Sequence, residues 1–111
     1  MAEDAIHCPA YDAINILQGK WVLHIIRHLL DGPRGFNELS RGVGGVNPAT
    51  LAQRLDQLEE LGIVKKTVHS TMPPRTSYQL TPAGQALHDV VTAIDRWARK
   101  YLKTPAVSTR A

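Results

Sequence analysis

The sequence predicts a mainly α-helical fold with one small antiparallel β-hairpin. Three features indicate it: apolar residues recur at helical spacing on both sides of the centre, Gly44-Gly45 interrupts that pattern, and two short β-prone runs flank Pro73-Pro74. A short helix, a glycine turn, a second helix and a hairpin, in this order, are typical of a winged helix-turn-helix. We expect a single domain over residues 1–111, with the helix-turn-helix at about 36–61 and the wing at about 63–81.

Length and composition limit the class of protein. A chain of 111 residues, 43% of them hydrophobic, has room for one modest core. The formal net charge of +3 suits a polyanionic partner without requiring one. A single cysteine excludes an intrachain disulfide and favours a reducing, cytoplasmic environment. No segment approaches about 20 continuous apolar residues, so no membrane partner is expected, and the acidic start at Glu3-Asp4 argues against a signal peptide.

Three helices are predicted up to the glycine turn. Apolar residues at a spacing of three predict a first helix over about 10–18. A wide apolar stripe predicts a second helix from Lys20 to Leu30, which Gly32-Pro33 ends. A third, shorter helix begins near Phe36 and is weakened by Gly42.

The helix after the glycine turn has a sharply defined start. Asn47 is a good N-cap and Pro48 suits the first helical position. Leucines at spacings of four and three then give this helix a core-facing side up to about Leu61. Thr81-Pro82 repeats the same start and opens a last helix over about 82–103, one of two expected dimerisation helices together with 10–18.

The polar side of the helix that begins at Pro48 offers side chains to DNA. A helix of roughly 20 Å, at about 1.5 Å per residue, fits a major groove about 12 Å wide. Glutamine can pair with adenine, threonine can contact the thymine methyl group, and arginine can bind guanine or phosphate. A solvated amphipathic helix would also be polar outside, so both interpretations stay open. The candidate DNA contacts on this helix and before it are Arg34, Asn37, Asn47, Ala49, Thr50, Gln53, Arg54 and Gln57.

Basic side chains flank the predicted wing. The candidates for contacts with phosphate or the minor groove are Lys65, Lys66, His69 and Arg75. Such contacts orient the protein on DNA more than they determine which base sequence it binds. The alternative is an exposed hairpin that charge keeps soluble.

A set of short motifs occurs in fixed order along the chain. They are Cys8-Pro9, Gly19-Lys20-Trp21, Phe36-Asn37-Glu38-Leu39, Leu51 with Arg54-Leu55, Leu58-Glu59 before Leu61-Gly62, Pro73-Pro74-Arg75, Tyr78, Leu80-Thr81, Gly84 and Trp97. Together they resemble the HxlR-type winged-helix regulators from about Cys8 to Tyr101. The resemblance implies a bacterial or archaeal transcription factor that is dimeric through its terminal helices and binds a two-fold related operator. Two departures are mild: Gly35 stands where a basic residue is frequent, and Val46 where isoleucine is usual.

The terminal helices are the predicted dimer interface. Two winged helices related by symmetry place their recognition helices about one DNA turn, ~34 Å, apart. The last helix is longer than one small core can cover, so its apolar side needs a partner surface. The predicted interface residues are Tyr11, Ile14, Leu17, Val91, Ile94, Trp97 and Tyr101. The alternative is that these helices pack only on their own domain.

Cys8 precedes the first predicted helix. Helix N-termini favour the reactive thiolate form of cysteine. Some relatives in the resembling family sense oxidants, quinones or aldehydes through a cysteine at the matching position, so the resemblance implies a redox- or electrophile-responsive regulator. With no second cysteine in the chain, a disulfide would form between subunits or with a small thiol. A small packing residue is the alternative role.

Other functional classes fit less well. His24 and His28 share a helix face and could bind Zn²⁺ in a metal-responsive regulator, with Cys8 or His88 arriving by folding. A winged helix can also serve protein contacts without binding DNA. No pattern places a nucleophile, a base and an orienting group together, so we expect no enzyme, no catalytic residues, no metal and no cofactor.

Overall fold

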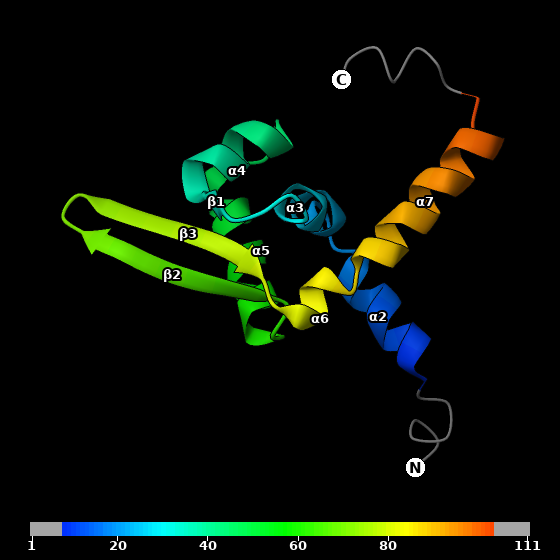
Figure 1. Ribbon diagram of the computed structural model, residues 1–111, viewed down its shortest axis with the longest axis horizontal. Coiled ribbons are helices and arrows are strands. Elements are labelled where there is room, and N and C mark those ends of the chain that lie inside the picture. The colour runs from blue at the N-terminus through cyan, green and yellow to red at the C-terminus, as the bar shows by residue number, and fades with distance from the viewer. Residues whose placement is uncertain (1–7, 104–111) are drawn as a thin grey trace.

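The computed structural model describes residues 8–103 and confirms a mainly helical fold with a small antiparallel sheet (Figure 1). A hairpin extends from one side of the body, and two helices project from the other side. The elements in chain order are α2 (Pro9–Leu17), α3 (Val22–Leu29), β1 (Arg34–Gly35), α4 (Phe36–Val43), α5 (Pro48–Glu60), β2 (Val64–Thr71), β3 (Pro74–Leu80), α6 (Pro82–Gln85) and α7 (His88–Tyr101).

Helices α4 and α5 form the helix-turn-helix that the sequence predicts. Gly44 and Gly45 turn the chain between them with φ values of 66° and 84°, which glycine adopts at little steric cost. Asn47 caps α5, because its Oδ1 accepts hydrogen bonds from the backbone N–H groups of Ala49 (2.7 Å) and Thr50 (3.4 Å). The predicted start of α5 is therefore confirmed.

The sheet contains one strand more than the sequence predicts. Its order is β1-β3-β2, with antiparallel pairing throughout. Strand β1 pairs Arg34 with Tyr78, and two residues are too few to show an alternating pattern. Strands β2 and β3 also reach further than expected, because Thr71 pairs with Pro74 and leaves only Met72-Pro73 as the turn. Proline is tolerated there, at the end of the ladder.

Two helix boundaries differ from the prediction. Helix α3 starts at Val22 and not at Lys20, because Trp21 takes a left-handed φ of 77°. The single helix predicted over 82–103 is wrong: α6 ends at Gln85 and α7 starts at His88. Within α6, Gly84 packs so closely on the Ile63 carbonyl and Leu80 that an added Cβ would clash. Helix α6 is thus held on the body while α7 leaves it.

The core lies between α3, α4, α5 and the base of the hairpin. Its buried residues are Val22, Ile25, Ile26, Leu29, Leu39, Val46, Leu51, Leu55, Leu58, Val64, Tyr78 and Leu80. Within the described part of the chain, α2 and α7 add no buried residue to this set. The body therefore forms one closed core, and the two terminal helices stand largely outside it (Figure 1).

Candidate nucleic-acid interface

Helix α5 presents a polar strip to solvent because its leucines fill the core. Leu51, Leu55 and Leu58 are buried, so the opposite side of the helix points outward. Ala49, Gln53 and Gln57 are exposed there, and Thr50 is half-buried at the edge. The strip also carries Asp56 and Glu60 toward its C-terminal end. The N-terminal half of the strip is therefore the part suited to approach a polyanion.

Arg54 lies on the flank of α5 and not on this outer strip, and its contact with DNA stays a prediction. Its side chain is half-buried on the flank of α5 that faces the turn between α2 and α3. The Nε–H group donates a hydrogen bond to the Lys20 carbonyl at 3.0 Å, and Nη1 donates to Gln57 Oε1 at 3.5 Å. One helical residue corresponds to about 100° of rotation, which separates Arg54 from Gln53.

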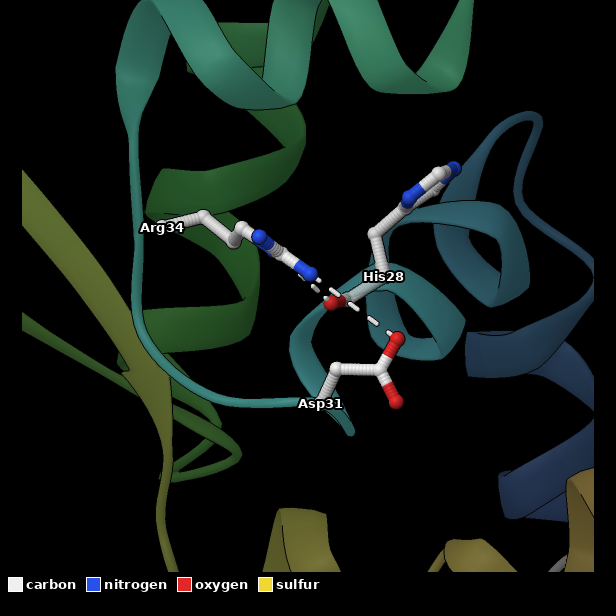
Figure 2. A network of polar contacts seen from close by, with 3 residues as sticks. All are labelled: His28, Asp31 and Arg34. Atoms are coloured by element: carbon white, nitrogen blue, oxygen red, sulfur yellow. Dashed lines mark hydrogen bonds and ion pairs between the residues drawn. The ribbon is translucent and has the colours of Figure 1, made fainter.

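Arg34 is likewise held by its own chain (Figure 2). Its Nε–H group donates to the His28 carbonyl at 3.4 Å, and Nη2 lies 3.8 Å from Asp31 Oδ2. The guanidinium group thereby joins β1 to the C-terminal end of α3. Sequence reasoning could not find this contact, because β1 itself was not visible in the sequence pattern.

The wing and α4 bring three predicted DNA contacts together. Asn37 on α4, His69 on β2 and Arg75 on β3 line one groove of about 600 Å³. His69 Nε2 and Ser77 Oγ lie 2.8 Å apart, which fixes the imidazole on this side of the hairpin. The groove offers basic and amide groups beside the helix-turn-helix, together with the Glu38 carboxylate, which accepts a hydrogen bond from the Gly35 N–H group.

The two wing lysines lie on opposite faces of the hairpin. Both are exposed, but they occupy neighbouring positions on β2, and side chains alternate along a strand. Lys65 pairs with Gln79, whereas Lys66 pairs with the buried Tyr78. The two lysines are therefore not equivalent as candidate DNA contacts, although the sequence gives no reason to distinguish them.

His28 packs against α4 and prefers its neutral form. A Cβ added to Gly42 would lie 3.2 Å from the imidazole ring, so glycine allows this close approach. Burial lowers the pKa of His28, and the positive charges of Arg27 and Arg34 lower it further. Residues 8–103 contain no group of three or more His, Cys, Asp or Glu side chains that could hold a metal ion. The described structure thus gives the His24–His28 pair no third ligand of these kinds.

Most of the predicted dimer residues form an exposed apolar stripe on the projecting helices. Tyr11, Ile14, Ile94, Trp97 and Tyr101 are all large and exposed, with the last two at 55% and 57%. The prediction missed Val90, which lies one turn before Ile94 on the same stripe. Leu17 and Val91 differ: Leu17 packs against the core, and Val91 is half-buried in a groove beside Arg27 and Leu30.

Cys8 occupies the N-cap position of α2 and is exposed. Its carbonyl accepts hydrogen bonds from the backbone N–H groups of Tyr11 (3.1 Å) and Asp12 (3.3 Å). The backbone is therefore fixed by the first turn of the helix, while the thiol remains accessible.

Known proteins of similar sequence and structure are transcriptional regulators. The HTH-type transcriptional regulator YdeP of Bacillus subtilis is 31% identical over 100 residues, which cover 90% of this chain and 78% of YdeP. The reduced form of the transcriptional regulator YodB from B. subtilis superposes with a TM-score of 0.76 at 33% identity, over 87% of this chain and 96% of that one. YodB has also been solved bound to a quinone.

The redox regulator HypR, in its oxidised form, gives a TM-score of 0.78 at 30% identity, covering 87% of this chain and all of HypR. Across residues 8–103, no helix has the length and apolar character needed to cross a membrane. The family model described as HxlR-like helix-turn-helix matches residues 16–106. This chain therefore belongs to the HxlR-like helix-turn-helix family, whose members are winged-helix transcriptional regulators and not enzymes.

Proposed function

We propose that the protein acts as a homodimer on a two-fold related DNA operator, with α5 in the major groove. The exposed strip of α5 from Ala49 to Gln57 carries this proposal, because the amide side chain of Gln53 points to solvent there and can meet base edges. The groove lined by Asn37, His69 and Arg75 supports it with groups suited to phosphate. Such a regulator acts in the cytoplasm, where its operator lies.

Gln53 is the side chain that we assign to base reading. It lies at the centre of the exposed strip, and glutamine can form a bidentate pair with adenine. Operators are first selected from genomic fragments, and the affinity of wild type is then measured on single-base variants. Gln53→Ala should relax the preference at one base position by ~1–3 kcal/mol, since one pair of base contacts is lost.

Gln85→Ala is the matched control, because Gln85 is also exposed but lies on α6. It should leave the base preference unchanged. Wild-type affinity should fall steeply as salt rises, because bound phosphates release counterions. Binding that is absent at all salt concentrations would instead favour a winged helix used for protein contacts.

The dimer is assigned to the stripe on α2 and α7. Trp97 and Tyr101, with ring centroids 5.9 Å apart, supply large aromatic area of the kind that anchors interfaces. Trp97→Ala should convert dimer to monomer in sedimentation experiments at micromolar concentration. Wild type that sediments as a monomer at that concentration would contradict the homodimer.

We also propose that Cys8 makes the regulator responsive to oxidants or electrophiles. The exposed thiol supports this, as do the quinone-bound YodB structure and the redox regulator HypR. Two Cys8 thiols from the two subunits would form one disulfide and give two electrons and two protons to an oxidant such as diamide. Diamide should change the operator affinity of wild type but not of Cys8→Ser. Equal responses from both proteins would exclude the thiol as the sensor.

A further inference from the structure

We infer that Arg54 positions the recognition helix on the body and does not itself contact DNA. This inference deepens the proposed function and rests on it. The Arg54 Nε–H group reaches a carbonyl 34 residues away in sequence, at Lys20, with an N···O distance of 3.0 Å. Charged donors form stronger hydrogen bonds than neutral ones. The contact therefore joins α5 to the turn that follows α2.

The turn that accepts this hydrogen bond has an unusual conformation. Trp21 adopts a φ of 77°, which is uncommon for any residue other than glycine and strains the backbone. The φ angle of Trp21 rotates the Lys20–Trp21 peptide and so sets the direction of the Lys20 carbonyl. The strained residue thus helps to present the acceptor to Arg54.

The same turn also lies close to the glycine turn within the helix-turn-helix. A Cβ built on Gly45 would lie 3.7 Å from the outer ring atom Cη2 of Trp21. Residues 20 and 21 therefore lie beside the glycine turn before α5 and, through Arg54, are bonded to the flank of α5 itself. Two contacts at different points along a segment limit its rotation as well as its translation.

Arg54 lies in a groove between α2 and α5. A groove of about 480 Å³ lies between them, lined by Asn15, Ile16 and Gly19 on one side and by Arg54, Gln57 and Leu58 on the other. The arginine side chain extends along this groove to the turn.

Three substitutions separate positioning from DNA contact. Glutamine places its Nε2 donor at the chain position of the arginine Nε but removes the charge. Methionine has a similar stem but no donor and no charge. Lysine keeps the charge but places a methylene group where Nε was. Positioning predicts that Arg54→Gln binds the operator within about twofold of wild type, whereas Arg54→Met and Arg54→Lys lose on the order of tenfold.

A direct phosphate contact predicts the opposite order of operator affinities. Arg54→Lys would then retain binding, and Arg54→Gln would bind the operator as weakly as Arg54→Met. The salt dependence of Arg54→Gln would also become shallower by about one released counterion. That pattern would overturn the inference, as would wild-type affinity in Arg54→Met.

A measurement without DNA keeps the test independent of operator binding. The ¹⁵N chemical shift of the Trp21 amide reports on the Lys20 carbonyl, because both belong to one peptide group. It should move in Arg54→Met and Arg54→Lys and stay near wild type in Arg54→Gln. An unchanged shift in all three variants would show that the contact is absent in solution. If wild type bound no DNA, the proposed function would fail, and this shift alone would still decide whether Arg54 holds the turn.

Discussion

The helix-turn-helix body and the projecting terminal helices use apolar residues in opposite ways. In the body, α3, α4, α5 and the base of the hairpin bury their apolar residues against one another within a single chain. On α2 and α7, residues such as Ile14 and Trp97 remain exposed. Sequence periodicity is equally clear in both regions. An apolar stripe in a sequence therefore predicts a surface that packs against another surface. It does not tell whether that other surface belongs to the same chain.

The two regions are expected to contribute to different processes, the body to folding of the protomer and the terminal helices to its assembly. Leucines and isoleucines of the body contribute to folding of the protomer, because their burial needs no partner. The stripe on α2 and α7 contributes free energy only when another surface covers it. An exposed apolar patch of this kind usually marks an interaction site.

The largest effect is expected from truncating the core. Leu55 is 0% exposed, so Leu55→Ala should lower the free energy of unfolding by about 2–5 kcal/mol through lost burial and a residual cavity. Ile94, at 48% exposed, is the matched residue on α7. In dilute, monomeric protein, Ile94→Ala should cost less than about 0.5 kcal/mol. Urea denaturation at several protein concentrations measures both values. Equal losses of unfolding free energy in the monomer would show that both regions contribute alike to folding of the protomer.

A smaller effect is expected at the start of α5. Asn47→Ala removes the oxygen that accepts from the Ala49 and Thr50 N–H groups, and should lower stability by about 1 kcal/mol. Asn37→Ala, at an exposed position in the first turn of α4, is the control and should change stability by less than about 0.5 kcal/mol. Thermal unfolding of both variants measures the difference. Similar losses would mean that the cap does not limit the stability of α5.

The smallest effect concerns pH and His28. Burial, Arg27, Arg34 and His24 lower the pKa of His28 below its ordinary value of 6.5, and Asp31 partly opposes them. As pH falls, His28 therefore binds a proton at a higher pH in the unfolded chain than in the folded chain. The stability that His28 contributes is present above about pH 6.5 and is lost as pH falls through the pKa of the folded state.

Denaturation between pH 5 and 8 should show this loss in wild type and less of it in His28→Gln. His88→Gln, at an exposed site on α7, is the control and should follow wild type. A wild-type and a His28→Gln profile of the same shape would contradict the assignment to His28.

Much of the fold could be predicted because its signals are local. Asn47 and Pro48 fix the start of α5, and Gly44-Gly45 fix the turn before it. These signals depend on backbone geometry within a few residues, and the structure keeps them unchanged. The two-residue strand β1 and the close packing of Gly84 in α6 depend on distant partners, Tyr78 for one and the Ile63 carbonyl for the other. Neither partner leaves a pattern in the nearby sequence.

The candidate site shows the same limit. Gln53 was predicted on the exposed strip of α5 and lies there, because leucine spacing fixes which side faces the core. Arg34 and Arg54 are predicted DNA contacts because of their charge and of their places before and on the helix that begins at Pro48. In the fold, each guanidinium group meets a backbone carbonyl, of His28 and of Lys20 respectively. Every residue has a backbone carbonyl group that can accept a hydrogen bond, so no sequence pattern predicts which carbonyl group these arginines will contact.

The order of the elements, the glycine turn and the leucine side of α5 were determined by the sequence itself, since spacing and backbone preference act over short distances. The tertiary structure decided which basic side chains remain available, where the last helix breaks, and that the stripe on α2 and α7 lies outside the core. Those outcomes depend on contacts between residues far apart along the chain, and only the folded chain brings such residues together.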